Sequence, residues 1–285
     1  METEISCFEK PILKVRNLTK QFGEGCEFCL KVNTNVLIKN YCPHCGTVYA
    51  CKDISFEVYS GEILGVVGES GSGKSTMLQC LYFDQEVTAG EAFIGSYKNG
   101  ETNIFQESSQ AKRYLKNNVL GKVYQNPILG LKMEFSAIGN IAEKLIAAGA
   151  RNVCDMEIRG KELLDRVNIP LFRIKEAPKN FSGGMQQRVQ IAKALSNNPP
   201  ILLLDEVTTG LDLSVQANVL DLIKQIQREL GISMLVVSHD LAVIRMLADR
   251  TIVMLDGRVV EEGLTDQILE DPQNPYTQEL VHSLI

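Results

Sequence analysis

The sequence has no apolar run that approaches the roughly 20 residues needed to cross a bilayer. It also has no signal-peptide core, because residues 1–10 alternate polar and charged groups. We therefore expect a cytoplasmic protein, which would be peripheral to the inner membrane only through a membrane partner. Internal repeats and low-complexity tracts are absent as well.

Positive charge is scarce relative to negative charge. The 29 Lys and Arg residues face 35 Asp and Glu residues, which gives a net charge of −6. An acidic protein lacks the counterion release that drives binding to a phosphate backbone, so we expect no nucleic-acid partner. The chain is 45% hydrophobic and 22% charged, which is ordinary for a folded protein of 285 residues with a sizeable core.

A glycine-rich stretch follows a short apolar run at residues 63–67 and precedes a segment that can form a helix. Strand, glycine loop and helix in this order are the context of a P-loop, whose successive N–H groups bind a polyphosphate. Lys74 would place a positive charge on the outer phosphates, and the Ser75 hydroxyl would bind Mg²⁺. We predict nucleotide contacts from Gly68, Glu69, Ser70, Gly71, Ser72, Gly73, Lys74, Ser75 and Thr76.

Strands and helices alternate along the second half of the chain. Residues 201–204 form a continuous apolar run, typical of a strand buried on both faces of a parallel sheet. The expected order after it is a helix over 214–230, a strand over 232–237, a helix over 241–248 and a strand over 251–255. This alternation predicts an α/β fold with a mainly parallel core sheet.

The first half of the chain predicts a different arrangement. Alternating strands at 12–22 and 54–58 indicate a β-hairpin that is opened by an inserted module over residues 24–48. A polar loop is expected over 95–110, and apolar residues at three-to-four spacing predict helices between 136 and 169.

Two adjacent acids end the apolar run at residues 201–204. Carboxylates at the C-terminal edge of a parallel sheet stand beside a P-loop at the topological switch point. Asp205 could hold Mg²⁺ directly or through water, and Glu206 could polarise the attacking water. With a P-loop upstream, we interpret this pair as catalytic and not as a solvated turn.

These motifs resemble the ATP-binding cassette (ABC) family, and the resemblance covers nearly all of the chain. The stretch Ser182-Gly183-Gly184-Met185-Gln186 is similar to the family's signature sequence, which is far more specific than a P-loop. The resemblance implies that Gln125 is the Q-loop glutamine, which senses Mg²⁺ and the attacking water, and that His239 is the switch histidine at the γ-phosphate. The implied catalytic residues are Glu206, His239 and Gln125, and the implied Mg²⁺ contacts are Ser75, Gln125 and Asp205.

The same resemblance implies further ATP contacts. Those in the signature and in the D-loop are Ser182, Gly183, Gly184, Gln186 and Asp212. Phe22 is similar in position to the aromatic that stacks on adenine, and Tyr49, beyond the insert, is the alternative. The chain departs from the family in having Val207 where proline usually follows the catalytic glutamate, which puts only the local turn geometry in doubt.

The resemblance implies a P-loop ATPase of the ABC type over residues 11–285, with an antiparallel β subdomain and a helical subdomain over 126–181. ATP at Lys74 of one subunit would be covered by Ser182 of the facing subunit, because the N-terminus of the signature helix offers a second anion site. We expect a head-to-tail dimer around two ATP molecules, formed with a second copy or with a related ABC subunit. It would hydrolyse ATP to ADP and phosphate.

Several stretches bear on the branch of the family. The tail at 271–277 and the run at 212–217 are similar to ATPase subunits of oligopeptide-, dipeptide- or nickel-type importers, which dock on membrane permeases. The stretches 125–131, 136–141 and 147–151 resemble more closely the ATP-binding subunits of the carbon–phosphorus lyase (phosphonate-degrading) machinery. We favour this second branch, which implies a soluble enzyme partner. An assembly or activation ATPase for another soluble metalloenzyme is a third interpretation.

The insert over residues 24–48 contains two CxxC pairs, formed by Cys26, Cys29, Cys42 and Cys45. Each pair can chelate one metal ion, and the pattern is close to that of a four-cysteine zinc ribbon. We predict a zinc site, with iron as the alternative because thiolates also suit it. The insert would either brace the adenine side of the ATP site or dock a partner.

The remaining cysteines have no partner spacing and are expected to be reduced thiols: Cys7, Cys51, Cys80 and Cys154. Cys51 is near enough in sequence to be a spare ligand. His44, inside the second pair, is expected to be exposed and not a ligand.

Overall fold

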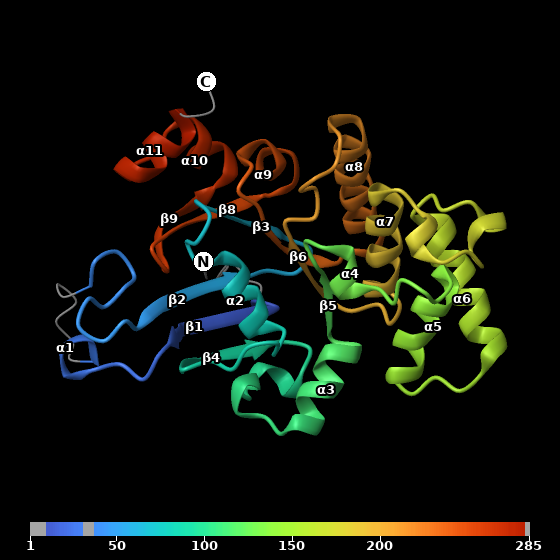
Figure 1. The fold of residues 1–285 in the computed structure, drawn as a ribbon, viewed down its shortest axis with the longest axis horizontal. Coiled ribbons are helices and arrows are strands. Elements are labelled where there is room, and N and C mark those ends of the chain that lie inside the picture. The colour runs from blue at the N-terminus through green and yellow to red at the C-terminus, as the bar shows by residue number, and fades with distance from the viewer. Residues whose placement is uncertain (1–9, 31–36, 283–285) are drawn as a thin grey trace, which may run out of the picture.

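The computed structural model describes residues 10–30 and 37–282, so Cys7 and part of the insert lie outside the described residues. Two sheets form the centre of the molecule (Figure 1). The antiparallel sheet has the order β2-β1-β4, with β2 at Val48–Val58, β1 at Leu13–Phe22 and β4 at Ala89–Ile94. The core sheet has the order β5-β6-β7-β3-β8-β9 and is parallel except for its last pair.

The strands of the core sheet are short. They are β5 (Leu120–Val123), β6 (Ile201–Asp205), β7 (Ser233–Val237), β3 (Ile63–Val67), β8 (Arg250–Leu255) and β9 (Arg258–Leu264). Every residue of β3, β6 and β7 is buried, as the apolar run at 201–204 predicts for a strand covered on both faces.

Helices surround the core sheet and form a separate group at one end of the molecule (Figure 1). The described helices include α1 (Glu27–Leu30), α2 (Lys74–Leu81), α3 (Ser109–Asn118), α4 (Pro127–Gly130), α5 (Ala137–Ala147) and α6 (Val153–Arg166). They continue with α7 (Gly183–Ala194), α8 (Leu213–Leu230), α9 (Leu241–Leu247), α10 (Thr265–Glu270) and α11 (Pro275–His282). Short 3₁₀ turns lie at Lys98–Gly100, Ile104–Gln106, Leu171–Arg173 and Pro178–Asn180.

The core sheet separates two hydrophobic cores. Along β6, Ile201 and Leu203 pack with the antiparallel sheet and α2, whereas Leu202 and Leu204 pack with the helices on the other side. This alternation follows from the period of two in a strand. The predicted α/β fold with an antiparallel subdomain, a mainly parallel core sheet and helical parts is confirmed.

The hairpin of β1 and β2 is opened by the insert, as predicted, but β2 begins at Val48 and not at residue 54. The two strands pair antiparallel from Leu13 opposite Val58 to Phe22 opposite Val48. The chain therefore leaves the sheet at Phe22 and returns at Val48, and the insert projects from that end of the hairpin.

The region after β4 differs from the expected polar loop at 95–110. It contains two 3₁₀ turns and the start of α3, a helix that the apolar pattern did not predict. Ser108 caps α3 by accepting a hydrogen bond from the Ala111 N–H at 3.3 Å, while Leu115 is the helix's one buried residue. A helix that buries so little leaves almost no hydrophobic periodicity to detect. Among the described helices, none is both long and apolar enough to span a membrane.

Candidate functional site

The glycine loop connects β3 to α2, as the sequence predicts. Gly68 and Gly73 have positive φ angles of 149° and 101°. A Cβ atom at Gly68 would lie 2.1 Å from the Met254 carbonyl oxygen, and one at Gly73 would lie 1.9 Å from the Ala50 carbonyl oxygen. Only glycine fits at these two positions, because the backbone approaches its neighbours too closely for any side chain.

Lys74 is 4% exposed and points into this loop. Its Nζ donates to the carbonyl oxygens of Gly68 at 2.7 Å and Glu69 at 2.8 Å. Burial lowers the pKa of Lys74, while the nearby carboxylates of Glu206 and Asp205 act in the opposite direction. A cation in a glycine loop, followed at once by a helix N-terminus, is an arrangement that binds phosphate.

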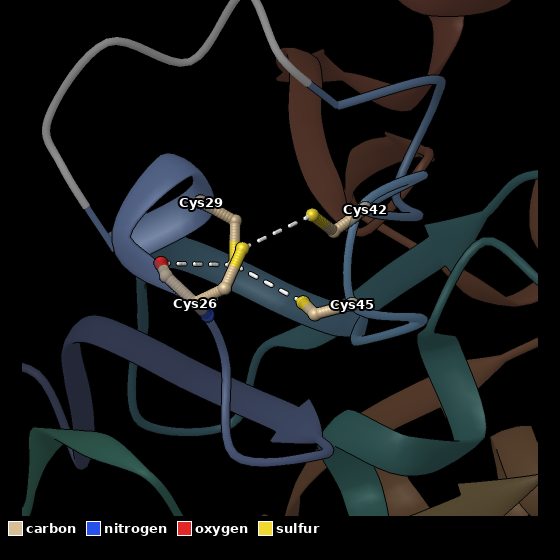
Figure 2. A group of neighbouring side chains, drawn as sticks. All are labelled: Cys26, Cys29, Cys42 and Cys45. Carbon is tan, nitrogen blue, oxygen red and sulfur yellow. Dashed lines mark hydrogen bonds between the residues drawn. The ribbon is translucent and has the colours of Figure 1, made fainter.

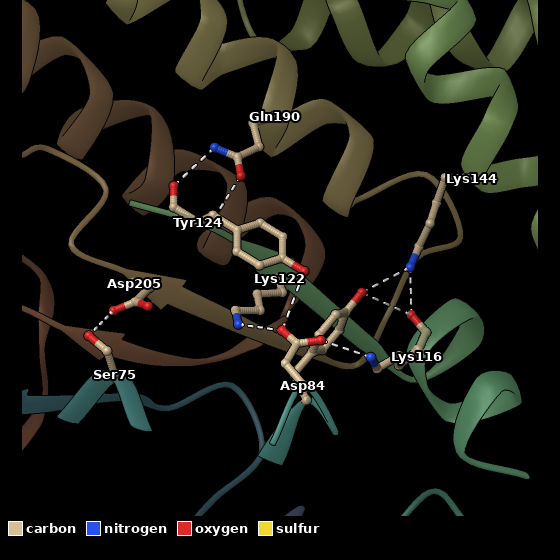
Figure 3. A network of polar contacts seen from close by, with 9 residues as sticks. Ser75, Asp84, Lys116, Lys122, Tyr124, Lys144, Gln190 and Asp205 are labelled. Atoms are coloured by element: carbon tan, nitrogen blue, oxygen red, sulfur yellow. Dashed lines mark hydrogen bonds and ion pairs between the residues drawn. The ribbon is translucent and has the colours of Figure 1, made fainter. Parts of the chain in front are cut away.

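Ser75 and Asp205 meet at the carboxyl edge of the core sheet. The Ser75 hydroxyl donates to Asp205 Oδ1 at 2.8 Å (Figure 3). Asp205 is 7% exposed, and this burial raises the pKa of its carboxyl group. A hydroxyl and a carboxylate at this distance offer the oxygen ligands that Mg²⁺ prefers, so the two residues fit that ion.

Glu206 lies among three polar side chains from separate loops. Its Oε2 accepts a hydrogen bond from Gln125 Nε2 at 2.9 Å and lies 3.1 Å from His239 Nδ1. The Thr209 hydroxyl also donates to this oxygen, at 3.3 Å. The structure therefore brings together Gln125, Glu206 and His239, the three residues that the sequence predicts to be catalytic.

The backbone at Glu206 is unusual. Its φ angle of 44° lies in the left-handed region, which non-glycine residues seldom adopt, and its N–H donates to the Val237 carbonyl at 2.9 Å. Strain of this kind at a polar site holds a side chain in one orientation. Val207, which stands where the family usually has proline, is 3% exposed and packs in the core.

The predicted signature residues begin α7. Ser182 caps this helix by accepting from the Met185 N–H at 3.4 Å, and Ser182 and Gly183 are exposed. Gly184 is buried because α8 packs on it: a Cβ there would lie 2.4 Å from Val215 Cγ1. In Figure 1, α7 lies well apart from α2, so the fold does not bring the signature to the glycine loop of the same chain.

Two other predicted ATP contacts have distinct surroundings. The Gln186 amide donates to the carbonyl oxygens of Pro178 and Phe181, at 3.0 and 3.1 Å, so it braces the turn before α7. Asp212 is exposed and stands at the N-terminus of α8.

The two candidates for stacking on adenine differ in accessibility. Phe22 is 45% exposed at the end of β1. Tyr49 is 5% exposed, and its hydroxyl donates to the Cys29 carbonyl at 3.1 Å. Because its ring is enclosed within the insert, Tyr49 is not available to adenine, and Phe22 is retained as the candidate.

The four cysteines of the insert gather in one cluster (Figure 2). Their sulfur atoms all lie within 4.8 Å of one another, with separations of 3.7 Å for Cys26–Cys29, 3.8 Å for Cys26–Cys42 and 3.7 Å for Cys29–Cys45. Ligands about 2.3 Å from a tetrahedral ion are about 3.8 Å apart, so these separations fit one ion with four thiolates. The hydroxyl and amide of Thr47 lower the pKa of Cys45 to about 6, whereas the pKa of Cys26 is raised to about 11, so a metal would have to displace the Cys26 proton on binding.

Cys51 is not a spare ligand, which corrects the alternative left open by the sequence. It is fully buried between the sheets, and its Sγ donates to the Gly73 carbonyl at 3.6 Å, away from the cluster. His44 is exposed, as predicted, and its ring stacks on Phe28 with the centroids 4.5 Å apart.

Two residues at the site, Gln190 and Tyr276, belong to no recognised motif, and the sequence did not predict their contacts. Gln190 of α7 binds the backbone of Tyr124 on both sides, accepting from its N–H at 2.6 Å and donating to its carbonyl at 3.0 Å (Figure 3). Tyr276 of α11 accepts the Glu69 N–H with its hydroxyl at 3.0 Å. Both join segments far apart in sequence, so neither local pattern nor spacing could indicate them.

A partly buried cluster of lysines beside the Ser75–Asp205 pair was also missed (Figure 3). Asp84 binds Lys116 and Lys122 at 2.8 Å each, and the Lys122 side chain is 1% exposed. Lys144 donates to the Lys116 carbonyl at 2.5 Å and to the Tyr82 hydroxyl at 3.3 Å. Burial lowers the pKa of Lys144 to about 8, and the neighbouring cations add to this effect.

Comparisons with known proteins agree with this geometry. The family model for ABC transporters matches residues 51–209. An Escherichia coli (strain K12) protein described as the phosphonates utilization ATP-binding protein PhnK is 42% identical over 97% of this chain and 98% of its own length. The oligopeptide transport ATP-binding protein OppF of Bacillus subtilis is 37% identical over 84% of this chain and 77% of its own. The ATP-binding cassette MJ0796, solved as a dimer in a post-hydrolysis state bound to ADP and Pi, gives a TM-score of 0.73 at 30% identity, with 89% of this chain and 98% of that chain covered.

The lysine cluster yields a test by pH. Because the pKa of Lys144 falls from 10.5 to about 8 on folding, the unfolded chain binds this proton more tightly. Burial of the charged lysine therefore lowers the free energy of unfolding. This destabilisation is greatest below pH 8, where both states are protonated, and it declines as the pH rises from 8 toward 10.5. We expect Lys144→Met to raise the free energy of unfolding at pH 7 by on the order of 1 kcal/mol, after the loss of two hydrogen bonds.

Urea unfolding at pH 7, 8 and 9.5 measures this effect. The gain from Lys144→Met should shrink toward pH 9.5, while the exposed control Lys161→Met should show no such trend. A gain independent of pH would mean that Lys144 is not a buried charge.

Proposed function

The chain belongs to the ABC transporter family of ATPases, and we propose that it drives conformational change in a soluble phosphonate-degrading enzyme complex, the carbon–phosphorus lyase machinery. The observation that carries this proposal is the 42% identity to PhnK, which extends over 97% of this chain and 98% of the relative. The importer ATPase OppF is 37% identical and matches over less of both chains. An ATPase that drives an oligopeptide-type permease is the second candidate, and this similarity to OppF is what favours it.

Hydrolysis would follow from the arrangement at the carboxyl edge of the core sheet. Lys74 and the glycine loop would bind the phosphates, and Phe22 would stack on adenine. Ser75 and Asp205 would hold Mg²⁺, which neutralises charge on the phosphates when bound. Glu206 would accept a proton from the attacking water. Gln125 and His239, both bonded to the same oxygen of Glu206, would keep its carboxylate turned toward that water.

A second subunit would complete the site. ABC ATPases form dimers, and the structure leaves Ser182 and Gly183 exposed at the N-terminus of α7. The free N–H groups there would bind the terminal phosphate held by the facing chain. Whether that chain is a second copy or a related ABC subunit, the same surface would be used.

We further propose that the cysteine cluster holds one zinc ion. The sulfur separations near 3.7 Å fit a single tetrahedral ion and are shorter than a cluster with several irons would impose on its four ligands. A single iron would have the same geometry, so metal analysis decides between the two ions.

The role of Glu206 is tested by Glu206→Gln. The amide keeps the size of the side chain but cannot take a proton, so ATP hydrolysis should fall by about 10²–10⁴. The affinity for ATP should remain, and ATP should now trap the dimer. Phosphate release and size-exclusion chromatography measure the two effects. The exposed acid at Glu101 provides the control Glu101→Gln, and normal turnover in Glu206→Gln would remove the assigned base.

The metal proposal predicts one equivalent of zinc per chain in protein purified without chelators. The double substitution Cys42→Ser with Cys45→Ser should abolish binding, because two of four ligands are lost. Cys154→Ser, at an exposed thiol outside the cluster, is the control. Elemental analysis gives the stoichiometry, and a content far below one zinc or iron in the unmodified chain would contradict the proposal.

The proposed partner is tested with the native complex. Purification of the tagged chain from its own cells, after extraction with a mild detergent that keeps any membrane permease in solution, should recover the soluble phosphonate-degrading subunits in stoichiometric amounts. Recovery with membrane permeases would instead establish the importer function.

A matched pair of variants tests which surface of the chain contacts the proposed partner. Leu129 of α4 is 71% exposed and lies within a stretch that resembles the phosphonate branch, so Leu129→Asp should lose the partner while retaining ATP hydrolysis. Leu264 is 61% exposed at the end of β9, and Leu264→Asp should retain both.

A further inference from the structure

The hairpin ties the cysteine cluster to the adenine side of the candidate ATP site. Phe22, the last residue of β1, is paired with Val48, the first residue of β2, and the insert connects the two. Its two CxxC pairs lie on opposite arms of the insert, one around α1 and the other before β2 (Figure 2). An ion bound to all four thiols would therefore hold the two arms together directly beyond Phe22.

The insert also holds the start of β2 through specific hydrogen bonds. Thr47 accepts the Gly25 N–H with its hydroxyl at 3.0 Å, and its carbonyl accepts the Cys42 N–H at 2.8 Å. The Tyr49 hydroxyl donates to the Cys29 carbonyl at 3.1 Å, and the Tyr49 N–H donates to the Asn40 carbonyl at 2.7 Å. Residues 47–49 are thus fixed by both arms of the cluster.

Residues 50–52 of β2 contact the glycine loop. The Ala50 carbonyl faces Gly73 so closely that a Cβ there would lie 1.9 Å away, and Cys51 Sγ donates to the Gly73 carbonyl at 3.6 Å. Gly257, in the turn between β8 and β9, donates its N–H to the Ser72 carbonyl at 3.1 Å and accepts the Lys52 N–H at 2.7 Å. Residues 50–52 therefore form one wall of the loop that precedes Lys74.

In the described part of the insert and the start of β2, the buried apolar group consists of Cys29, Cys42 and Tyr49, with Cys26 and Leu37 partly buried against it. Phe28 and Leu30 are 57% and 60% exposed. A module with so small a core depends on its metal for folding.

We propose that the metal ion in the cysteine cluster sets the affinity of the ATP site, by fixing residues 47–52 of β2 against the glycine loop and Phe22 beside adenine. The ion is a positioning element and does not contact the nucleotide. Its loss frees the two arms of the insert, loosens the start of β2 and widens the site at Gly73 and Phe22. This inference rests on the proposed metal site, and the experiment below separates failure of one from failure of the other.

The test uses the full chain in three forms. The first is the chain as purified, the second has its metal removed with a chelator, and the third is the metal-free chain after zinc has been added back. The probe is Mg·ADP, and calorimetry measures its dissociation constant. Stripping should weaken binding by about tenfold, and restored zinc should return the original affinity. In steady-state hydrolysis the KM for ATP should rise while kcat at saturation is retained, because Glu206 and His239 are untouched.

A second variant tests the coupling with the thiols intact. Tyr49→Phe removes the hydrogen bond to the Cys29 carbonyl, so it should keep one equivalent of zinc yet bind Mg·ADP about fivefold more weakly. Tyr41→Phe makes the same change at a 44% exposed ring of the insert and should leave affinity unchanged. Unchanged affinity in the stripped chain overturns the coupling and leaves the metal site standing. A chain that binds no metal as purified or after zinc addition overturns both.

Discussion

The backbone of the glycine loop is held between two sheets by contacts that leave no room for a side chain. Gly68 lies against the Met254 carbonyl of β8, in the core sheet, and Gly73 lies against the Ala50 carbonyl of β2, in the antiparallel sheet. The loop can take the shape that presents its N–H groups to phosphate only when both sheets are in place. For this reason the site depends on the whole domain, although its motif spans only the nine residues 68–76.

The position of the Glu206 carboxylate depends on contacts between three loops. Gln125, Glu206 and His239 follow three different strands of the core sheet and meet at one oxygen of Glu206. Gln125 directly follows Tyr124, whose backbone is bound by Gln190 of α7. A continuous series of contacts therefore joins α7, which begins at the predicted signature residues, to the Glu206 carboxylate.

Contacts between separate segments also position the cysteine insert, which lies beside Phe22, the proposed adenine contact. This end of the hairpin carries an extension whose apolar core, in its described residues, is small. A single ion bound to the four thiols would join its two arms more firmly than this packing does. The two residues that border the insert, Phe22 and Val48, are paired in the sheet, so order within the insert is transmitted into the strands.

The sequence by itself determined the elements whose signal is local: the strand–loop–helix of the P-loop, the apolar run before Asp205 and Glu206, the Ser182 helix cap and the spacing of two CxxC pairs. Each depends on neighbouring residues or on a period of the backbone. Tertiary structure alone enclosed Tyr49 in the insert, removed Cys51 from the cluster and gathered Lys144 and its partners around Asp84. It also placed Tyr276 on the glycine loop, 207 positions away in sequence. These features arise from contacts between segments far apart in the chain, and such contacts exist only after both hydrophobic cores have brought the segments together.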